Sequence, residues 1–253
     1  MHVIDEVVTA MSTQPWGITE SQGRMLHEFI LREKPHSILE LGAGVGTSAV
    51  YMTAALEQIG SGRVLSIDRN PDLPEWVNKS FAKIDSKLQR FHELLLTSSS
   101  YNDELMKLIL AQTRDGKCEP CFDFCFIDGA HLWEIDSCAF FLSEKLLKPG
   151  GWMLFDDLTW TVAGSPEALK NGVGKGMSAE MLQTQQVMRV FDLCVSQHPG
   201  FDSFTITDDW GWARKKVEQA ASAPVSITRL YANQNSVTGR LRAAARRLIK
   251  GAA

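Results

Sequence analysis

Short apolar runs alternate with amphipathic stretches along most of the chain. The runs that predict strands are residues 37–41, 63–67, 88–94, 122–127 and 152–155. The stretches in which apolar residues recur at helical spacing are residues 22–32, 47–59, 74–84, 101–112 and 132–147. Strands that alternate with helices in this way are typical of a doubly wound α/β fold with a mostly parallel sheet.

The pattern changes after the fifth predicted strand. Residues 160–177 are rich in glycine and other small residues and show no periodicity. We expect an insert there, which is either a lid over the site or a disordered segment. A helix is predicted for residues 178–197, and an antiparallel hairpin at the sheet edge for residues 201–207 and 211–215.

The chain of 253 residues is long enough for one α/β domain with additions at its ends. We expect a helical cap in residues 1–36, the α/β domain in residues 37–216, and a linker with a tail helix in residues 217–253. Five cysteines favour reduced thiols over a disulfide framework. No run approaches the roughly 18 apolar residues that span a bilayer, and the N-terminus lacks a basic leader, so a cytoplasmic protein is expected.

Charge is unevenly distributed, although the formal total is only −4. Residues 229–253 carry six basic side chains and no acid, and apolar residues recur among them at helical spacing. A basic amphipathic helix of this kind lies on an anionic membrane surface or docks on an acidic body, its own or that of a second subunit. The acidic remainder makes nucleic-acid binding unexpected, and a homo-oligomer stays an open alternative.

A glycine-rich turn joins the first predicted strand to the following helix. Its sequence, residues 40–48, is Glu-Leu-Gly-Ala-Gly-Val-Gly-Thr-Ser, with glycines at 42, 44 and 46 and Thr47 opening the helix. Such a turn lets a ligand lie against bare backbone at a helix N-terminus. It predicts a nucleoside-like cofactor bound at the edge of the sheet.

Asp68 follows the second predicted strand, where a carboxylate can accept both hydroxyls of a ribose bound over the glycine turn. The alternative is a solvated turn residue, because Asp-Arg-Asn-Pro also favours a turn. A nicotinamide dinucleotide would use the same geometry, but the glycine spacing fits its motif only partly. Glu40 also favours a cofactor with an ammonium or sulfonium group over one with a diphosphate.

Over residues 22–215 the chain resembles the class I S-adenosylmethionine-dependent methyltransferases. Residues 40–46 look like their first motif, Asp68 like their acid after the second strand, and residues 147–151 like the turn before their fifth strand. The resemblance implies a seven-stranded sheet with one antiparallel strand. It also implies cofactor contacts from a set of residues around the glycine turn and the strand ends: Glu40, Gly42, Ala43, Gly44, Gly46, Thr47, Asp68 and Asp128.

Three carboxylates follow the fourth and fifth predicted strands, namely Asp128, Asp156 and Asp157. Because parallel strand ends border one crevice, these acids would repel one another unless a cation intervenes, and Mg²⁺ is the simplest candidate. The arrangement resembles catechol-type and sugar O-methyltransferases, which implies that these three residues hold the metal. Those catechol enzymes have lysine where this chain has His131, which we therefore expect to be the general base.

The predicted function is methyl transfer to a hydroxyl of a small molecule or a sugar-containing natural product. A metal-independent methyltransferase, in which the aspartates bind polar groups of the substrate, stays open. So do a nicotinamide-dependent oxidoreductase and a non-catalytic S-adenosylmethionine-binding module. His131 could also simply cap the following helix or bond a neighbouring acid. Cys118, Cys121 and Cys125 lack a fourth ligand for a zinc or iron–sulfur site.

Overall fold

Seven strands form one sheet in the order β3-β2-β1-β6-β7-β9-β8 in the computed structural model, which describes residues 3–14 and 17–217. The strands are β1 (Ser37–Leu41), β2 (Arg63–Asp68), β3 (His92–Leu96), β6 (Phe122–Ile127), β7 (Leu147–Phe155), β8 (Phe201–Thr207) and β9 (Trp210–Lys215). β9 lies between β7 and β8 and runs opposite to the other six strands of this sheet. The doubly wound sheet with a late antiparallel hairpin is thus confirmed.

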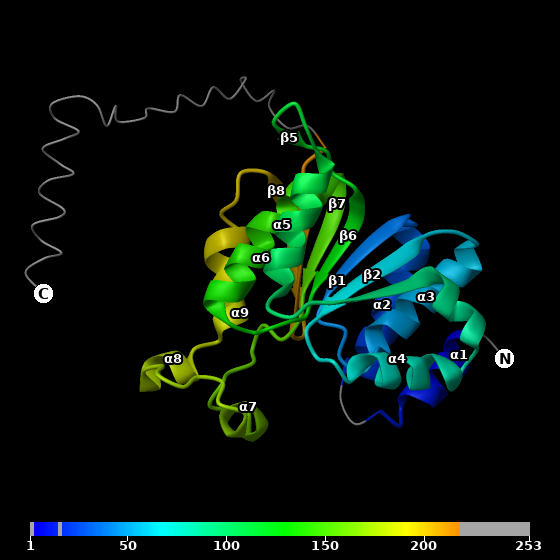
Figure 1. Ribbon diagram of the computed structural model, residues 1–253, viewed down its shortest axis with the longest axis horizontal. Coiled ribbons are helices and arrows are strands. Elements are labelled where there is room, and N and C mark those ends of the chain that lie inside the picture. Colours follow the sequence, from blue (N-terminus) through cyan, green and yellow to red (C-terminus); the bar gives the residue numbers. More distant parts are fainter. Residues whose placement is uncertain (1–2, 15–16, 218–253) are drawn as a thin grey trace, which may run out of the picture. The chain divides into compact units, whose positions relative to one another are not determined.

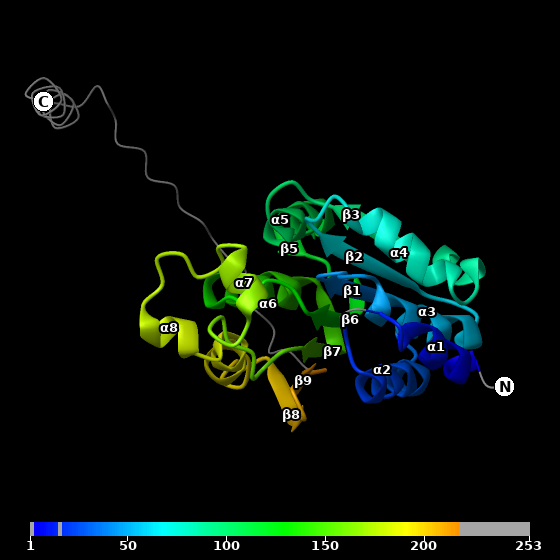
Figure 2. The same ribbon diagram turned by 90° about the horizontal axis from the view of Figure 1, so that it is seen from below.

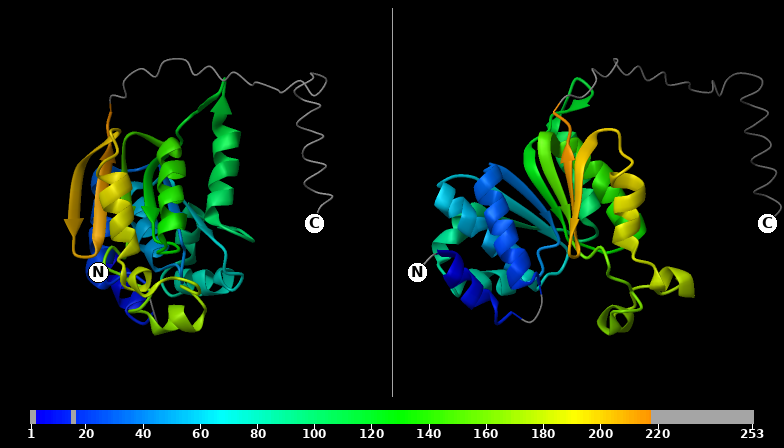
Figure 3. Two further views of the ribbon diagram at one scale, coloured as in Figure 1. Left: turned by 90° about the vertical axis from the view of Figure 1, so that its left-hand side faces the viewer. Right: turned by 180° about the vertical axis from the view of Figure 1, so that it is seen from behind.

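Helices cover both faces of the sheet (Figure 1). One layer contains α1 (Val3–Met11), α2 (Glu20–Glu33), α3 (Thr47–Ile59) and α4 (Leu73–Ala82). The other contains α5 (Tyr101–Gln112), α6 (Trp133–Leu146), α9 (Gln186–Val190) and the π-helical turn η2 (Phe191–Val195) that continues α9. Figures 2 and 3 show the same two layers from other directions. α1 packs against α2 and α3 in the first of these layers. The sequence pattern does not predict α1 as a separate helix.

The central strands are apolar on both sides because both faces are covered. In β1, Leu39 packs into the cluster beneath α5 and α6, whereas Ile38 packs into the cluster beneath α2 and α3. Glu40 is the polar exception in this strand, and it is fully buried.

Two predicted strands have different starting points in the structure. Residues 86–91 form a 3₁₀ helix, η1 (Ser86–Phe91), because the Asp85 side chain accepts the Lys87 N–H at 2.9 Å and caps it. β3 therefore begins at His92 and not at residue 88. β7 begins at Leu147, where a turn was expected, and its pairing with β6 shifts register between Phe122 and Phe124, so residues 148–151 form an irregularity inside the strand.

The continuous helix predicted for residues 178–197 is wrong. The segment forms α8 (Ala179–Gln183), then a break, then α9 and η2. At the break the buried Gln186 side chain accepts the Trp133 N–H at 2.9 Å and donates to the Met181 carbonyl at 3.3 Å. These bonds join α8 and α9 to the start of α6.

The insert contains ordered structure. α7 (Pro166–Lys170) and α8 project beyond the ends of the strands (Figures 1 and 3). A two-stranded hairpin, β4 (Thr113–Arg114) and β5 (Lys117–Cys118), extends the end of α5. The predicted tail helix lies outside the described residues. Within those residues, no helix combines the length and the apolar character that crossing a membrane requires.

Candidate active site

A cavity of about 920 Å³ opens where the order of the parallel strands reverses, at the carboxyl ends of β1 and β6. Doubly wound sheets bind their ligands in this crevice. The predicted residues that line it are Gly42, Gly44, Asp68, Asp128, His131, Asp156 and Asp157. These residues come from four chain segments, at the ends of β1, β2, β6 and β7, and they meet at one place, as the strand-end pattern predicts.

The three glycines of the turn have different roles. A Cβ on Gly42 would lie 1.8 Å from the backbone carbonyl oxygen of Asp128, so this glycine allows the chain after β6 to approach β1. A Cβ on Gly46 would lie 3.3 Å from Val77 of α4. Only at Gly44 is there nothing within 4 Å. Gly44 is therefore the glycine that presents bare backbone to the cavity, whereas all three were expected to do so.

Ala43, Gly46 and Thr47 do not line the cavity, although the resemblance implied cofactor contacts for them. Ala43 is buried and donates its N–H to Asp68 Oδ2 at 2.8 Å, which ties the glycine turn to the end of β2. Thr47 is also buried, and its hydroxyl has no hydrogen-bond partner. These residues shape the turn from beneath.

Asp68 lines the cavity with a carboxylate that is already partly engaged. Besides Ala43, the N–H groups of Arg69 and Asn70 donate to its other oxygen at 2.6 and 3.1 Å. A carboxylate offers about four lone-pair positions, so about one remains for a ligand. This leaves room for one ribose hydroxyl in the present arrangement, and the contact with both hydroxyls stays a prediction.

Glu40 does not line the cavity. Its two carboxyl oxygens accept hydrogen bonds from Ser48 of α3 and Ser66 of β2, beneath the glycine turn. Burial raises the pKa of Glu40 to about 7, against the opposing effect of these hydroxyl donors. Glu40 therefore faces Ser48 and Ser66 and not the cavity, and its contact with a cationic cofactor stays a prediction.

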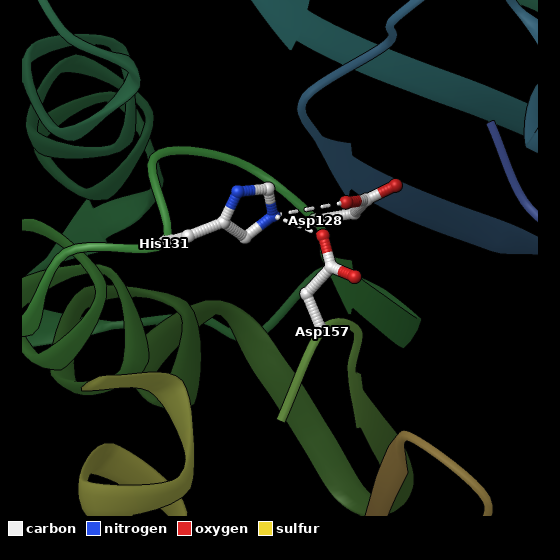
Figure 4. A group of neighbouring side chains, drawn as sticks. All are labelled: Asp128, His131 and Asp157. Atoms are coloured by element: carbon white, nitrogen blue, oxygen red, sulfur yellow. Dashed lines mark hydrogen bonds and ion pairs between the residues drawn. The ribbon is translucent and has the colours of Figure 1, made fainter. Parts of the chain in front are cut away.

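Asp128, His131 and Asp157 converge at the cavity floor (Figure 4). His131 Nε2 lies 3.3 Å from Asp128 Oδ1 and 3.1 Å from Asp157 Oδ2. One ligand atom from each of the three residues falls within 4.8 Å of the others, which is the spacing of a metal site. Asp128 and Asp157 follow the ends of β6 and β7, and His131 lies in the connection between β6 and α6.

The charges in this group are coupled. Burial alone would lower the pKa of His131, but the hydrogen bond to Asp128 and the charges of Asp128 and Asp157 outweigh it and raise the pKa to about 9. Burial raises the pKa of Asp128 to about 6, opposed by His131. The two neighbouring acids thus favour the charged form of the imidazole.

Asp156 differs from the other two acids. It is buried, and its Oδ1 accepts both the indole N–H of Trp210 and the N–H of Asp157 at 2.7 Å. Burial, followed by the charges of Asp128 and Asp157, raises the pKa of Asp156 to about 8. Among the described residues, the group whose ligand atoms converge within 4.8 Å contains Asp128, His131 and Asp157 and not Asp156, and the metal set of Asp128, Asp156 and Asp157 stays a prediction.

Several lining residues were not predicted from the sequence. Gly17, Ile18 and Thr19 precede α2, Gln22 lies in its first turn, and Ser99, Ser100 and Tyr101 follow β3. Asp208 and Asp209 come from the hairpin turn between β8 and β9. This turn was predicted, and because β8 is parallel to β7 its end lies at the edge where Asp157 is found. The predicted hairpin direction was thus the signal that could have identified Asp208 and Asp209 as lining residues.

Comparison with known proteins assigns the class of this fold and site. Residues 39–158 match a family model described as a methyltransferase domain. No curated protein sequence matches the chain significantly. The described methyltransferase segment runs from β1 to the residue after Asp157, so it contains every predicted site residue.

Solved structures share the fold at low sequence identity. An O-methyltransferase from Bacillus cereus in complex with S-adenosylhomocysteine is 20% identical, with a TM-score of 0.58 over 85% of this chain and 90% of that one. TomG, an O-methyltransferase of tomaymycin synthesis from Streptomyces achromogenes in complex with S-adenosylmethionine, gives the same values. A caffeoyl-CoA O-methyltransferase homologue from Staphylococcus aureus is 16% identical, with a TM-score of 0.57 over 85% and 90% of the two chains.

The fold is thus that of the class I methyltransferases. The chain contains a methyltransferase domain, and the protein is an enzyme of the methyltransferase type. The resemblance drawn from the glycine turn and the strand-end acids is confirmed at this level. The family match, and not the position of Glu40, separates it from a dinucleotide-dependent oxidoreductase.

Proposed function

We propose that this protein is an S-adenosylmethionine-dependent O-methyltransferase that acts on a hydroxyl of a small molecule or glycan. The observation that carries the proposal is a single cavity lined both by Gly44 and Asp68 and by Asp128, His131 and Asp157. A cofactor subsite and a group of acid and base side chains therefore share one enclosed space. This is the arrangement that methyl transfer from a bound donor to a bound acceptor requires.

The cofactor subsite is the part of the cavity between the glycine turn and Asp68. Bound there, S-adenosylmethionine supplies an electrophilic methyl group on a sulfonium. Gly44 leaves room for a nucleoside against backbone, and Asp68 retains capacity for one hydroxyl donor of a ribose. The solved neighbours that contain S-adenosylmethionine or S-adenosylhomocysteine support this assignment.

A divalent cation fits the Asp128, His131 and Asp157 group, because two carboxylates and an imidazole converge within 4.8 Å. Asp128 and Asp157 would hold Mg²⁺, for which carboxylate oxygen is the preferred protein ligand. Mn²⁺ would bind the same two carboxylates, which leaves the Nε2 lone pair of His131 free. When bound, such a cation polarises the acceptor hydroxyl and makes it a better nucleophile.

His131 is the proposed acceptor of the hydroxyl proton. Its Nε2 faces the space between the two carboxylates, where a substrate hydroxyl can reach it. An imidazole accepts a proton only when it is neutral, and the two carboxylates favour the charged form up to a pKa of about 9. Positive charge from another source beside these carboxylates would reverse that preference. Whether His131 can act as a base therefore depends on whether Asp128 and Asp157 also bind a cation.

A metal-independent methyltransferase is the second candidate, and one observation favours it. The His131 ring nitrogen already lies between the two carboxylates, where a metal cation would bind and neutralise their charge. In that case Asp128 and Asp157 orient the acceptor by hydrogen bonds. The two candidates differ in their response to a chelator.

The test has a binding step and a transfer step. Calorimetric titration with S-adenosylhomocysteine should show binding that Asp68→Ala weakens by at least tenfold. Transfer of a radiolabelled methyl group from S-adenosylmethionine should then be measured with a panel of catechols, sugars and other hydroxyl compounds, with Mg²⁺ or with EDTA. Loss of transfer in EDTA supports the metal-dependent form, and full transfer in EDTA supports the metal-independent form. Absence of S-adenosylhomocysteine binding would contradict the proposal as a whole.

A further inference from the structure

His131 is held in an unusual backbone conformation. Its φ is 55°, in the left-handed region that a side chain with a Cβ enters only at a cost. It belongs to residues 128–132, which connect β6 to α6 and are called the His131 loop here. The loop begins at a fixed point, because the Asp128 N–H donates to the Leu41 carbonyl at 2.8 Å. What holds the rest of the loop lies on two helices.

The backbone N–H groups on either side of His131 are both bound by side chains. The Ala130 N–H donates to the Tyr101 hydroxyl at 3.2 Å, and the Leu132 N–H donates to Asp136 Oδ2 at 2.9 Å. The Tyr101 hydroxyl in turn donates to Asp136 Oδ1. The two residues thus form one connected unit that binds the loop before and after His131.

Packing reinforces these hydrogen bonds. A Cβ on Gly129 would lie 2.5 Å from the Tyr101 ring, so the ring rests directly against the loop backbone. Tyr101 is 7% exposed and Asp136 is 1% exposed. Asn102, beside Tyr101 on α5, also donates to the Ile135 carbonyl of α6 at 3.0 Å and keeps the two helices in register. Hydrogen bonds in such a buried setting are strong and costly to break.

The protons of this unit are well defined. Burial and the neighbouring Asp136 carboxylate raise the pKa of Tyr101 far above its ordinary value, so the hydroxyl keeps its proton and donates it to Asp136. The same oxygen is then free to accept the Ala130 N–H. Each hydrogen bond therefore has one donor and one acceptor, and the unit has a single arrangement.

We propose that Tyr101 and Asp136 are positioning residues for His131. By binding the N–H groups of residues 130 and 132, they fix the left-handed backbone from which Nε2 reaches Asp128 and Asp157. The importance of this position for catalysis rests on the proposed function, but the positioning itself does not. Neither residue needs to touch the reacting atoms for this role.

The test follows the His131 side chain directly. Imidazole ¹H–¹⁵N correlations recorded at one pH are assigned by their loss in His131→Asn. Tyr101→Phe removes the hydroxyl and keeps the ring, and Asp136→Asn removes the charge and keeps the shape. In both variants we expect the His131 signals to shift or to broaden, with S-adenosylhomocysteine affinity within about threefold of the wild type. Tyr101→Phe should also lower kcat at least tenfold, at an unchanged KM for S-adenosylmethionine, with any acceptor from the panel above.

Matched controls separate positioning from general stability. Tyr51→Phe removes a hydroxyl from a buried tyrosine of α3, and Asp123→Asn alters a carboxylate that accepts the N–H groups of His36 and Ser37 at the opposite end of the sheet. Both should leave the His131 signals unchanged. Wild-type His131 signals in Tyr101→Phe and Asp136→Asn would overturn the proposal. So would equal changes in the control variants. If one of the two variants does not fold, the result for the other decides. If neither folds while both controls fold, Tyr101 and Asp136 have a structural role, and the positioning proposal is also overturned.

Discussion

The backbone carbonyl of Asp128 occupies the position that a side chain on Gly42 would need. The first glycine of the turn is therefore in contact with the start of the His131 loop. The proposed cofactor subsite and the acid–base group share this backbone contact. The turn that predicts a ligand site in the sequence thus also forms the contact between the chain after β1 and the chain after β6.

This contact distinguishes the two glycines that line the cavity. Gly42→Ala should destabilise the protein by about 3 kcal/mol or more, because the clash is with backbone at a φ of 91°. Gly44→Ala meets no atom and should cost about 1 kcal/mol for its left-handed backbone, while weakening S-adenosylhomocysteine binding. Urea unfolding and calorimetric titration measure the two effects. Gly60→Ala, with a φ of 84° and open space around it, is the control for backbone strain outside the site.

Glu40 should make stability depend on pH. Its pKa is raised from 4.5 to about 7 in the folded protein, so the folded state binds the proton more tightly than the unfolded state. The resulting stability is present in full below pH 4.5 and is lost as the pH rises through about 7. Glu40→Gln imitates the protonated form and should remove this slope, which is at most about 1.4 kcal/mol per pH unit for one proton. Equal pH profiles of unfolding free energy for both proteins would contradict the prediction.

His131 should titrate near pH 9 in the metal-free protein. The raised pKa means that its stabilising contribution is complete below pH 6.5 and declines as the pH rises through about 9. An NMR titration of the imidazole measures the value, and Asp157→Asn should lower it by removing one carboxylate. A pKa near the ordinary value in the wild type would show that the two carboxylates do not hold the proton.

Asp156 and Asp157 should differ in cation binding despite being neighbours. Asp157 belongs to the convergent group, so Asp157→Asn should weaken Mn²⁺ binding at least tenfold in a calorimetric titration. Asp156 has a pKa of about 8 and is mostly protonated at pH 7, and both of its hydrogen-bond donors bind one oxygen. Asp156→Asn should therefore leave Mn²⁺ affinity within about threefold of the wild type. The reverse order of effects would support the metal set expected from the sequence.

The sequence predicts the features that depend on local pattern. The apolar run of residues 122–127 followed by Asp128 gives a buried strand and places its acid at the sheet edge, and the same holds for Asp156 and Asp157 after β7. All three acids and Asp68 line the cavity as expected. Strand ends are predictable because a parallel sheet leaves its carboxyl ends at one edge.

The features that were missed depend on contacts between distant residues. Glu40 follows the strand pattern, but Ser48 and Ser66 turn its carboxyl inward, and nothing near residue 40 indicates this. His131 joins Asp128 and Asp157 because of a left-handed backbone that Tyr101 and Asp136 support from two helices. Local spacing cannot show which of several neighbouring acids a loop will turn toward the others.

The hairpin turn that brings Asp208 and Asp209 to the cavity has a consequence for biosynthesis. β9 inserts between β7 and β8, and it is the last strand of the described chain to be made. Until residue 215 has left the ribosome, β7 is an unpaired sheet edge and the cavity lacks one wall. The nascent chain can thus complete the wall formed by Asp208 and Asp209 only after residue 215 has left the ribosome.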